Sequence, residues 1–132
     1  MLVNFSNHPY EKWEDRQKEA ARVYGTTRDL KFPAVPGNAD EKDIDTMAER
    51  SVEEILALLG GGEPDEVLVQ WEFTLSYAVV SRLLDRGISV ISASADRRVT
   101  ETRDDEGRNV KQAVFCFDRF REYRKVNGKV EI

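Results

Sequence analysis

The stretch from Val67 to Arg98 limits the possible folds of this chain more than any other. Val67–Val69 and Ile88–Ile91 are short apolar runs rich in β-branched residues. Between them, Phe73–Leu84 has apolar residues on nearly every face, which predicts a helix buried on more than one side. Gly87 then provides a helix stop. A strand, a crossover helix and a second strand in about thirty residues form a βαβ unit, which predicts a parallel sheet.

The segments before this unit continue the alternation of strands and helices. Strands are predicted at Leu2–Phe5 and Asp29–Phe32. An amphipathic helix is predicted over Glu11–Tyr24, where Trp13, Gln17, Ala20, Ala21 and Tyr24 recur at helical spacing before Gly25. A second helix begins after a cap at Asn38 or Asp40 and ends at Gly60–Gly62. Its predicted core face is Ile44, Met47, Ala48, Val52, Ile55, Leu56 and Leu59.

The pattern changes to a period of two after Ala95. Arg97–Thr102 and Val110–Phe117 are predicted to form a β-hairpin around the polar loop Arg103–Asn109. The whole pattern predicts an α/β fold: a single Rossmann-like three-layer domain over residues 1–132, with a parallel sheet of about four strands in the order 2-1-3-4. Residues 1–95 form its core, 96–123 the hairpin and ending, and 124–132 a polar tail.

Composition limits the compartment and the partners. Cys116 is the one cysteine, so an internal disulfide is impossible and a reducing compartment is expected. No apolar run approaches the ~20 residues of a membrane span and the N-terminus has no signal-peptide pattern, so we expect a cytoplasmic protein with no membrane partner. The net charge of −5 argues against binding of long nucleic acids. The charge is uneven, however, and the basic part from Arg97 onward is compatible with a small anionic ligand.

The predicted strand order reverses between the first and third strands, and ligands of open α/β sheets bind at such a switch point. His8, the one histidine, falls there with Ser6 and Asn7. His8 can act as general acid or base, or can be a turn imidazole bonded to backbone. Ser6 and Asn7 can donate to phosphate or to a base edge, but turn chemistry explains either one alone equally well.

Two further turns supply candidate binding groups. Glu72 can accept from a ribose hydroxyl or an adenine amine, or it can only complement the helix dipole; Thr74 and Tyr77 can reach the same crevice. Ser94 lies in a predicted polar turn, Ser92–Asp96, and Arg97 and Arg98 follow this turn at the start of the next strand. Alternation along a strand directs at most one of the two arginines into the crevice, where a guanidinium suits phosphate. We expect Arg97 to be that residue.

Several common sites are absent from the sequence. There is no GxGxxG after the first strand and no Walker A motif. One cysteine and one histidine cannot form a structural zinc site. Cys116 lies between Phe115 and Phe117, which is typical of an inert core thiol rather than a nucleophile. We therefore expect no metal and no cofactor.

The residues at these turns carry a resemblance to a known family. The opening Asn4–Pro9 with Trp13, Gln17 and Ala20–Ala21 resembles the start of small CRISPR-associated proteins. The Trp71–Thr74 turn, Val80–Leu83, Gly87–Ile88, Ala93–Arg97 and Phe115–Tyr123 are similar to the same group, though no single motif is diagnostic. This is the CARF-like, Rossmann-like ring nuclease family of type III CRISPR systems.

The resemblance implies degradation of cyclic oligoadenylates, the second messengers of type III CRISPR defence, with cyclic tetra-adenylate the expected ligand. It implies a metal-independent phosphodiesterase in which the ribose 2′-hydroxyl attacks the adjacent phosphate. His8, Ser6 and Arg97 would be catalytic, and Asn7, Glu72, Thr74, Tyr77, Ser94 and Arg98 would bind substrate. Ser6 and His8 are separated by Asn7, where the related start has serine and histidine adjacent.

A symmetric ring suits a homodimer with two crevices facing one ligand, and the helix Phe73–Leu84 is a candidate for part of that interface. Two other functions fit the same residues. The protein can be a sensor or sequestering protein that binds a cyclic nucleotide without cleaving it, or a Rossmann-like interaction domain with no nucleotide ligand.

Overall fold

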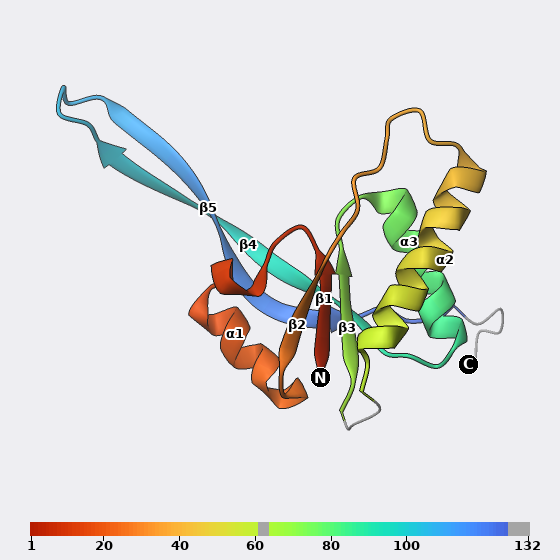
Figure 1. The fold of residues 1–132 in the computed structure, drawn as a ribbon. Helices are drawn as coiled ribbons and strands as arrows, with labels where there is room; N and C mark the ends of the chain where they lie inside the picture. The colour runs from red at the N-terminus through yellow and green to blue at the C-terminus, as the bar shows by residue number, and fades with distance from the viewer. Residues whose placement is uncertain (61–63, 127–132) are drawn as a thin grey trace, which may run out of the picture.

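The computed structural model, which describes residues 1–60 and 64–126, is built on one five-stranded sheet in the order β2-β1-β3-β4-β5 (Figure 1). Strands β1 to β4 are parallel, and β5 runs antiparallel beside β4. The predicted strand order and the C-terminal antiparallel hairpin are therefore confirmed. The strands are β1 (Leu2–Ser6), β2 (Thr27–Lys31), β3 (Glu66–Gln70), β4 (Val90–Arg103) and β5 (Asn109–Glu122).

Helices cover both faces of the sheet, as the right-handed crossovers predict. Helix α1 (Asp15–Ala21) lies on one face, where Leu2, Leu68 and Ile91 pack with Trp13 and Ala21. Helices α2 (Glu41–Leu58) and α3 (Phe73–Asp85) cover the other face. All five residues of β1 are buried, because β1 is central and covered on both sides.

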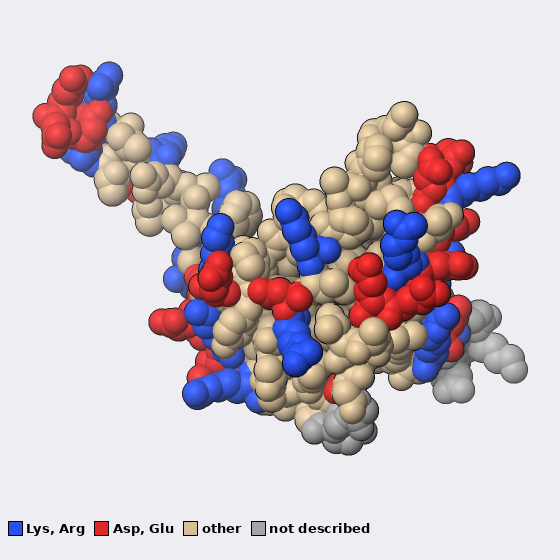
Figure 2. Space-filling view, in the orientation of Figure 1, with Lys and Arg blue, Asp and Glu red and all other residues tan. Residues whose placement is uncertain are grey.

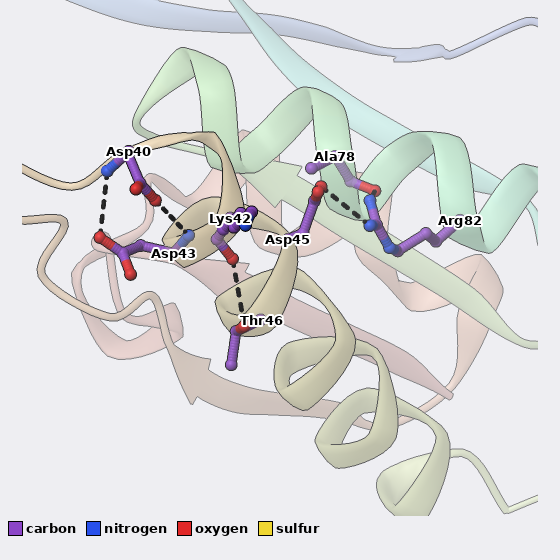
Figure 3. Close-up of polar contacts among 7 residues, drawn as sticks. All are labelled: Asp40, Lys42, Asp43, Asp45, Thr46, Ala78 and Arg82. Atoms are coloured by element: carbon purple, nitrogen blue, oxygen red, sulfur yellow. Dashed lines mark hydrogen bonds and ion pairs between the residues drawn. The ribbon is translucent and has the colours of Figure 1, made fainter.

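The start of α2 is fixed by a capping box. The Asp40 carboxylate accepts from the Asp43 amide at 2.8 Å, and the Asp43 carboxylate accepts from the Asp40 amide at 3.0 Å (Figure 3). Of the two predicted caps, the structure uses Asp40. Arg82 of α3 binds Asp45 of α2 at 3.1 Å, which ties the two helices together (Figure 3).

Two predictions for these helices need correction. Leu56 is exposed, because it lies at the margin of the buried stripe formed by Ala48, Ser51, Val52 and Ile55. Helix α3 packs against both the sheet and α2, as predicted, but it leaves Phe73 89% and Tyr77 76% exposed. Gly61 and Gly62, part of the predicted stop of α2, lie outside the described residues.

The single helix predicted over Glu11–Tyr24 is wrong. The segment forms a 3-10 turn (Tyr10–Lys12), α1, and a second 3-10 turn (Arg22–Tyr24) that ends, as predicted, at Gly25. Trp13 and Glu14 have extended backbones between the first turn and α1. The break lets the Trp13 ring enter the core and its Nε1–H donate to the His8 carbonyl at 3.0 Å.

The turn predicted at Ser92–Asp96 is also wrong, because β4 runs through it without a break. Beyond Ile91 the strand leaves β3 and is carried by its antiparallel ladder to β5. A register shift between Ser94 and Ala95 leaves Asp118 of β5 as an extra, bulged residue. The outer parts of β4 and β5, residues 95–117, project from the body as a two-stranded ribbon, called the arm below (Figure 1).

None of the helices within the described residues combines the length and apolar character needed to span a bilayer.

Candidate functional site

A cleft of about 570 Å³ lies on the α1 face, where the carboxyl ends of β1 and β3 meet the root of the arm. This switch-point cleft is within the size range of small-molecule sites. Four groups of residues line it: Ser6 with the turn after β1, the segment around the start of α1, the end of β3 with Trp71, and residues of β4 and β5. The lining includes Ser6, Asn7, His8, Gln17, Trp71 and Phe115.

The turn after β1 is a closed hydrogen-bond network. The Asn4 amide donates to the His8 carbonyl and to Asp29, each at 2.9 Å. The Ser6 hydroxyl donates to Asn4 Oδ1 at 2.7 Å and accepts from the His8 amide at 3.2 Å. Trp13 donates to the same His8 carbonyl. The polar groups of Asn4 and Ser6 are thus committed to holding the backbone of the turn, which makes it rigid.

The side chains of Asn7 and His8 are left exposed on this rigid turn. The His8 imidazole makes no hydrogen bond to any residue of the described ranges, whereas the His8 backbone is fully engaged. An exposed imidazole held on a fixed backbone can donate to or accept from a ligand. His8 is therefore the group in the cleft best placed for proton transfer.

The sequence pattern predicts only a helix position for Gln17, yet Gln17 lines the cleft. The residue is 7% exposed and its amide has no hydrogen-bond partner within residues 1–60 and 64–126. Its amide atoms are not fully enclosed, so they can bond water or a ligand in the cleft. Its position on the buried stripe of α1 gave no signal of this, because the same spacing is typical of packing.

Two aromatic rings supply flat apolar surface to the cleft. Trp71 is 58% exposed and Phe115 is 67% exposed. Exposed rings beside hydrogen-bonding groups are the arrangement on which nucleobases stack, with a typical contribution of about 1–3 kcal/mol per base. The sequence pattern predicts that Trp71 lies at a strand end near the ligand site, but it predicts Phe115 only as part of the apolar face of a hairpin.

The borders of the cleft are fixed by side chains that bond backbone. Gln70 accepts from the Ala93 amide at 2.8 Å and donates to the Ala93 carbonyl at 3.2 Å, so it bridges β3 and β4 where they diverge. Glu14 accepts a hydrogen bond from the Phe117 amide of β5. Glu14 also lines the cleft, so an anionic group of a ligand would bind away from its carboxylate.

Ser94, predicted to bind substrate, lines the cleft but its hydroxyl stabilises the bulge. It donates to the Arg119 carbonyl at 2.9 Å and accepts from the Arg119 amide at 3.3 Å. The hydroxyl therefore replaces ladder bonds that the bulged Asp118 interrupts.

The two arginines lie on opposite faces of the arm. Arg97 pairs directly with Phe115 in the ladder and shares its face, whereas Arg98 pairs with Val114 on the other face. Both arginines are exposed and neither lines the cleft itself. Arg97 lies beside Phe115, whose ring lines the cleft, so Arg97 is on the cleft's side of the arm.

Glu72, Thr74 and Tyr77 face a different hollow. They line a second cleft, of about 520 Å³, between α3 and the loop before α2. Glu72 caps α3: its carboxylate accepts from the amides of Thr74 and Leu75, both at 2.8 Å, and from the Thr74 hydroxyl. Burial raises the pKa of Glu72, but these hydrogen bonds outweigh it and the net shift is downward.

Within the described residues, no three His, Cys, Asp or Glu side chains come close enough together to hold a metal ion. The chemistry available in the cleft is thus hydrogen bonding by amides, stacking on rings, proton transfer by an imidazole and charge from an arginine at its edge.

Comparison with known proteins gives one match. The model of the uncharacterized protein MJ1673 family matches residues 1–121. The chain belongs to this family. The match covers every strand of the sheet through most of β5, so the cleft and the arm both lie within the part that defines the family. No curated protein and no solved structure matches the chain.

Proposed function

We propose that this member of the MJ1673 family is a metal-independent ring nuclease that binds and degrades cyclic oligoadenylates, with cyclic tetra-adenylate as its ligand. The observation that carries the proposal is the exposed His8 imidazole on a rigid turn, in a nucleotide-sized cleft that also holds exposed rings and amides. The resemblance of the N-terminal turn to CRISPR-associated ring nucleases supplies the ligand class. The ligand acts in type III CRISPR defence, which makes the proposed role antiviral and cytoplasmic.

In the proposed reaction, a ribose 2′-oxygen forms a bond to the adjacent phosphorus and the bond from phosphorus to the 5′-oxygen breaks. The products are a 2′,3′-cyclic phosphate and a 5′-hydroxyl. One proton leaves the 2′-hydroxyl and one reaches the 5′-oxygen; His8 carries one of these transfers and water the other. Catalysis by such a site rests mainly on in-line positioning and charge stabilisation.

The remaining residues have binding roles in this proposal. Trp71 and Phe115 stack on adenine, and Asn7 and Gln17 bond base edges or phosphate oxygens. Arg97 holds a phosphate as a fixed positive charge at the arm. Ser6 contributes by fixing the turn that carries His8, since its hydroxyl is engaged with Asn4 and the His8 backbone. Glu72, Thr74, Tyr77 and Arg98 stay outside this cleft, and a role for them in binding would need a ligand that reaches beyond it.

A binding protein that does not cleave its ligand is the second candidate. Ser6 and Ser94 have committed hydroxyls and Glu14 is bonded to the Phe117 amide, so His8 is the one group of the cleft lining left to move a proton. Binding needs no group that transfers a proton, whereas cleavage needs two proton transfers and the cleft offers one group for them.

Single-turnover incubation with cyclic tetra-adenylate, in excess EDTA, separates the two candidates. Cleavage to a species with a 2′,3′-cyclic phosphate, read by chromatography, supports the nuclease. Intact ligand together with a raised melting temperature identifies a binding protein. Intact ligand without a thermal shift contradicts both candidates, and activity that requires added Mg²⁺ or Mn²⁺ contradicts the metal-independent mechanism.

A further inference from the structure

The arm has a free edge that differs from ordinary protein edges. Strand β5 is the last strand of the sheet, and its stretch from Gln112 to Phe117 contains no charge and no proline. Natural edge strands are usually blunted by charges, prolines or short length, because an unpaired backbone otherwise pairs with another chain. The opposite edge of the arm, along β4, carries Asp96, Arg97, Arg98, Glu101 and Arg103 and is blunted in this way.

The alternation of hydrogen-bonded and non-hydrogen-bonded pairs along the β4–β5 ladder shows which backbone groups of β5 point outward. At the tip, the Asp104 amide donates to the Arg108 carbonyl, so Asp104 and Arg108 form a hydrogen-bonded pair. At the root, the Phe117 amide is turned outward to Glu14. Alternation between these ends leaves the amides and carbonyls of Ala113 and Phe115 on the free edge. Glu14 closes the edge at Phe117.

The arm alone is poorly suited to stability in water. A two-stranded ribbon is marginal without further strands or a packed face. Its side chains include the exposed apolar residues Val99, Val114 and Phe115. In Figure 2 the acidic side chains of the arm gather at its tip, and basic side chains are spaced along the stretch between the tip and the body. The arm therefore has the features of a surface that is covered in an assembly.

We propose that the free edge of β5 pairs antiparallel with the same edge of a second copy of this chain, about a two-fold axis at Val114. In this register Val114 lies opposite Val114, Ala113 opposite Phe115 and Gln112 opposite Cys116, so the uncharged residues from Gln112 to Cys116 meet one another. The two arms become one four-stranded sheet, which removes the marginal two-stranded ribbon.

Self-complementarity favours a second copy over other partners. About the two-fold axis, the exposed uncharged stretch around Val114 and Phe115 meets an identical stretch, so no charge lies within the paired segment. Nucleic acid is disfavoured as the occupant, because the carboxylates at the tip would repel its phosphates. The exposed apolar residues Phe73 and Tyr77 of α3 are another candidate interface. Unlike the edge of β5, this helix face has no repeating backbone pattern that selects a particular partner.

The pairing also places the two switch-point clefts. A two-fold axis perpendicular to a continuous sheet leaves the same face of both copies on the same side. Both clefts therefore open on one side, with the two Phe117 residues about 20 Å apart along the strand direction, from six residues at about 3.3 Å each. A role for the two neighbouring clefts in binding one ligand rests on the proposed function, whereas the pairing of the two β5 edges does not.

Two proline variants test the edge. Ala113→Pro removes an outward amide from β5, and Val99→Pro removes the matching outward amide from β4, since the two residues are paired in the ladder. Neither change removes a β4–β5 ladder bond. We expect wild type and Val99→Pro to dimerise alike in sedimentation equilibrium without ligand, and Ala113→Pro to raise the dimer dissociation constant at least tenfold. A monomeric wild type, or equal effects of the two prolines, overturns the proposal.

Cross-linking gives an independent test should a proline disturb the arm. In a Cys116→Ser background, Val114→Cys places two thiols in a non-bonded antiparallel pair, whose Cα separation of about 4.5 Å is within disulfide range. Mild oxidation should link most of this variant as a dimer. Thr100→Cys, on the same face but on β4, should stay unlinked. Equal linking of the two variants overturns the proposal. Because neither test uses nucleotide, their outcome is separate from that of the cleavage assay.

Discussion

The turns after β1 and after β3 carry similar kinds of polar side chains, but these side chains make different hydrogen bonds in the structure. Both follow buried parallel strands at the switch point, and each offers a titratable group with neighbouring hydroxyls. After β1, side chains of other residues satisfy the backbone and His8 stays free. After β3, Glu72 itself satisfies the backbone by capping α3. A polar group at a strand end is therefore available to a ligand only when something else bonds the local backbone.

The largest expected effect contrasts these two turns directly. His8→Ala should slow single-turnover cleavage by about 10²–10⁴-fold, the usual contribution of a general acid or base, with the melting temperature nearly unchanged. Glu72→Ala should do the reverse and preserve the cleavage rate. Rates and melting curves for both variants test the comparison. If His8→Ala cleaves at the wild-type rate, the imidazole has no catalytic role.

The next effect concerns the arginines on the two faces of the arm. Arg97→Ala should weaken binding of cyclic tetra-adenylate on the order of tenfold to a hundredfold, since hydrogen bonds to charged groups contribute about 1.5–3 kcal/mol. Arg98→Ala is the matched control and should bind normally, because it faces away from the cleft. Titration calorimetry measures both. Normal binding by both variants would mean that the ligand lies elsewhere.

The cap at Glu72 gives a smaller effect that depends on pH. Its folded pKa is lowered, so its contribution to stability is full above the unfolded value near 4.5 and is lost as pH falls through the folded pKa. Glu72→Ala should cost about 1 kcal/mol of unfolding free energy at pH 7, as loss of an N-cap does. The difference from wild type should shrink below pH 4. Glu49→Ala, an exposed carboxylate within α2, is the control and should show little change.

Gln17 gives the smallest expected effect. Gln17→Leu keeps the shape of a buried side chain but removes the amide that lines the cleft. Loss of a neutral hydrogen bond worth about 0.5–1.5 kcal/mol should weaken ligand binding a few-fold. Stability should hold or rise, because the amide has no partner within the described residues. An unchanged affinity would show that Gln17 bonds only water.

The sheet was predictable because β1 and β3 are short buried runs, such as Val67–Val69, and helical segments separate the successive parallel strands. The continuity of β4 was not, because Ser92–Arg98 contains small polar residues that are typical of a turn. Its strand conformation is imposed by pairing with β5, which local sequence does not encode. The break at Trp13 was missed for a similar reason: helical spacing does not reveal that the ring needs an extended backbone to reach the core.

For the site, the sequence located His8 and Asn7 through the strand order alone. It could not separate Ser6 and Ser94, whose hydroxyls bond backbone, from residues with free polar groups. That distinction depends on contacts such as the one between Ser94 and the bulge at Arg119. Gln17 and Phe115 were missed as cleft residues because their partners are distant in sequence.

The topology also has a consequence for how the chain reaches its native state. The arm closes locally: the Asp104 carboxylate accepts from the amides of Glu106 and Arg108, and Gly107 adopts a φ of 78°. Hairpins of this kind form in about 1–10 μs. Strand β1, by contrast, must wait for β3, since Val3 pairs with Val67. The uncharged edge of β5 is thus exposed before the body has formed, so arms of different chains can meet early. We expect the refolding yield to fall as protein concentration rises, and Ala113→Pro to relieve that dependence.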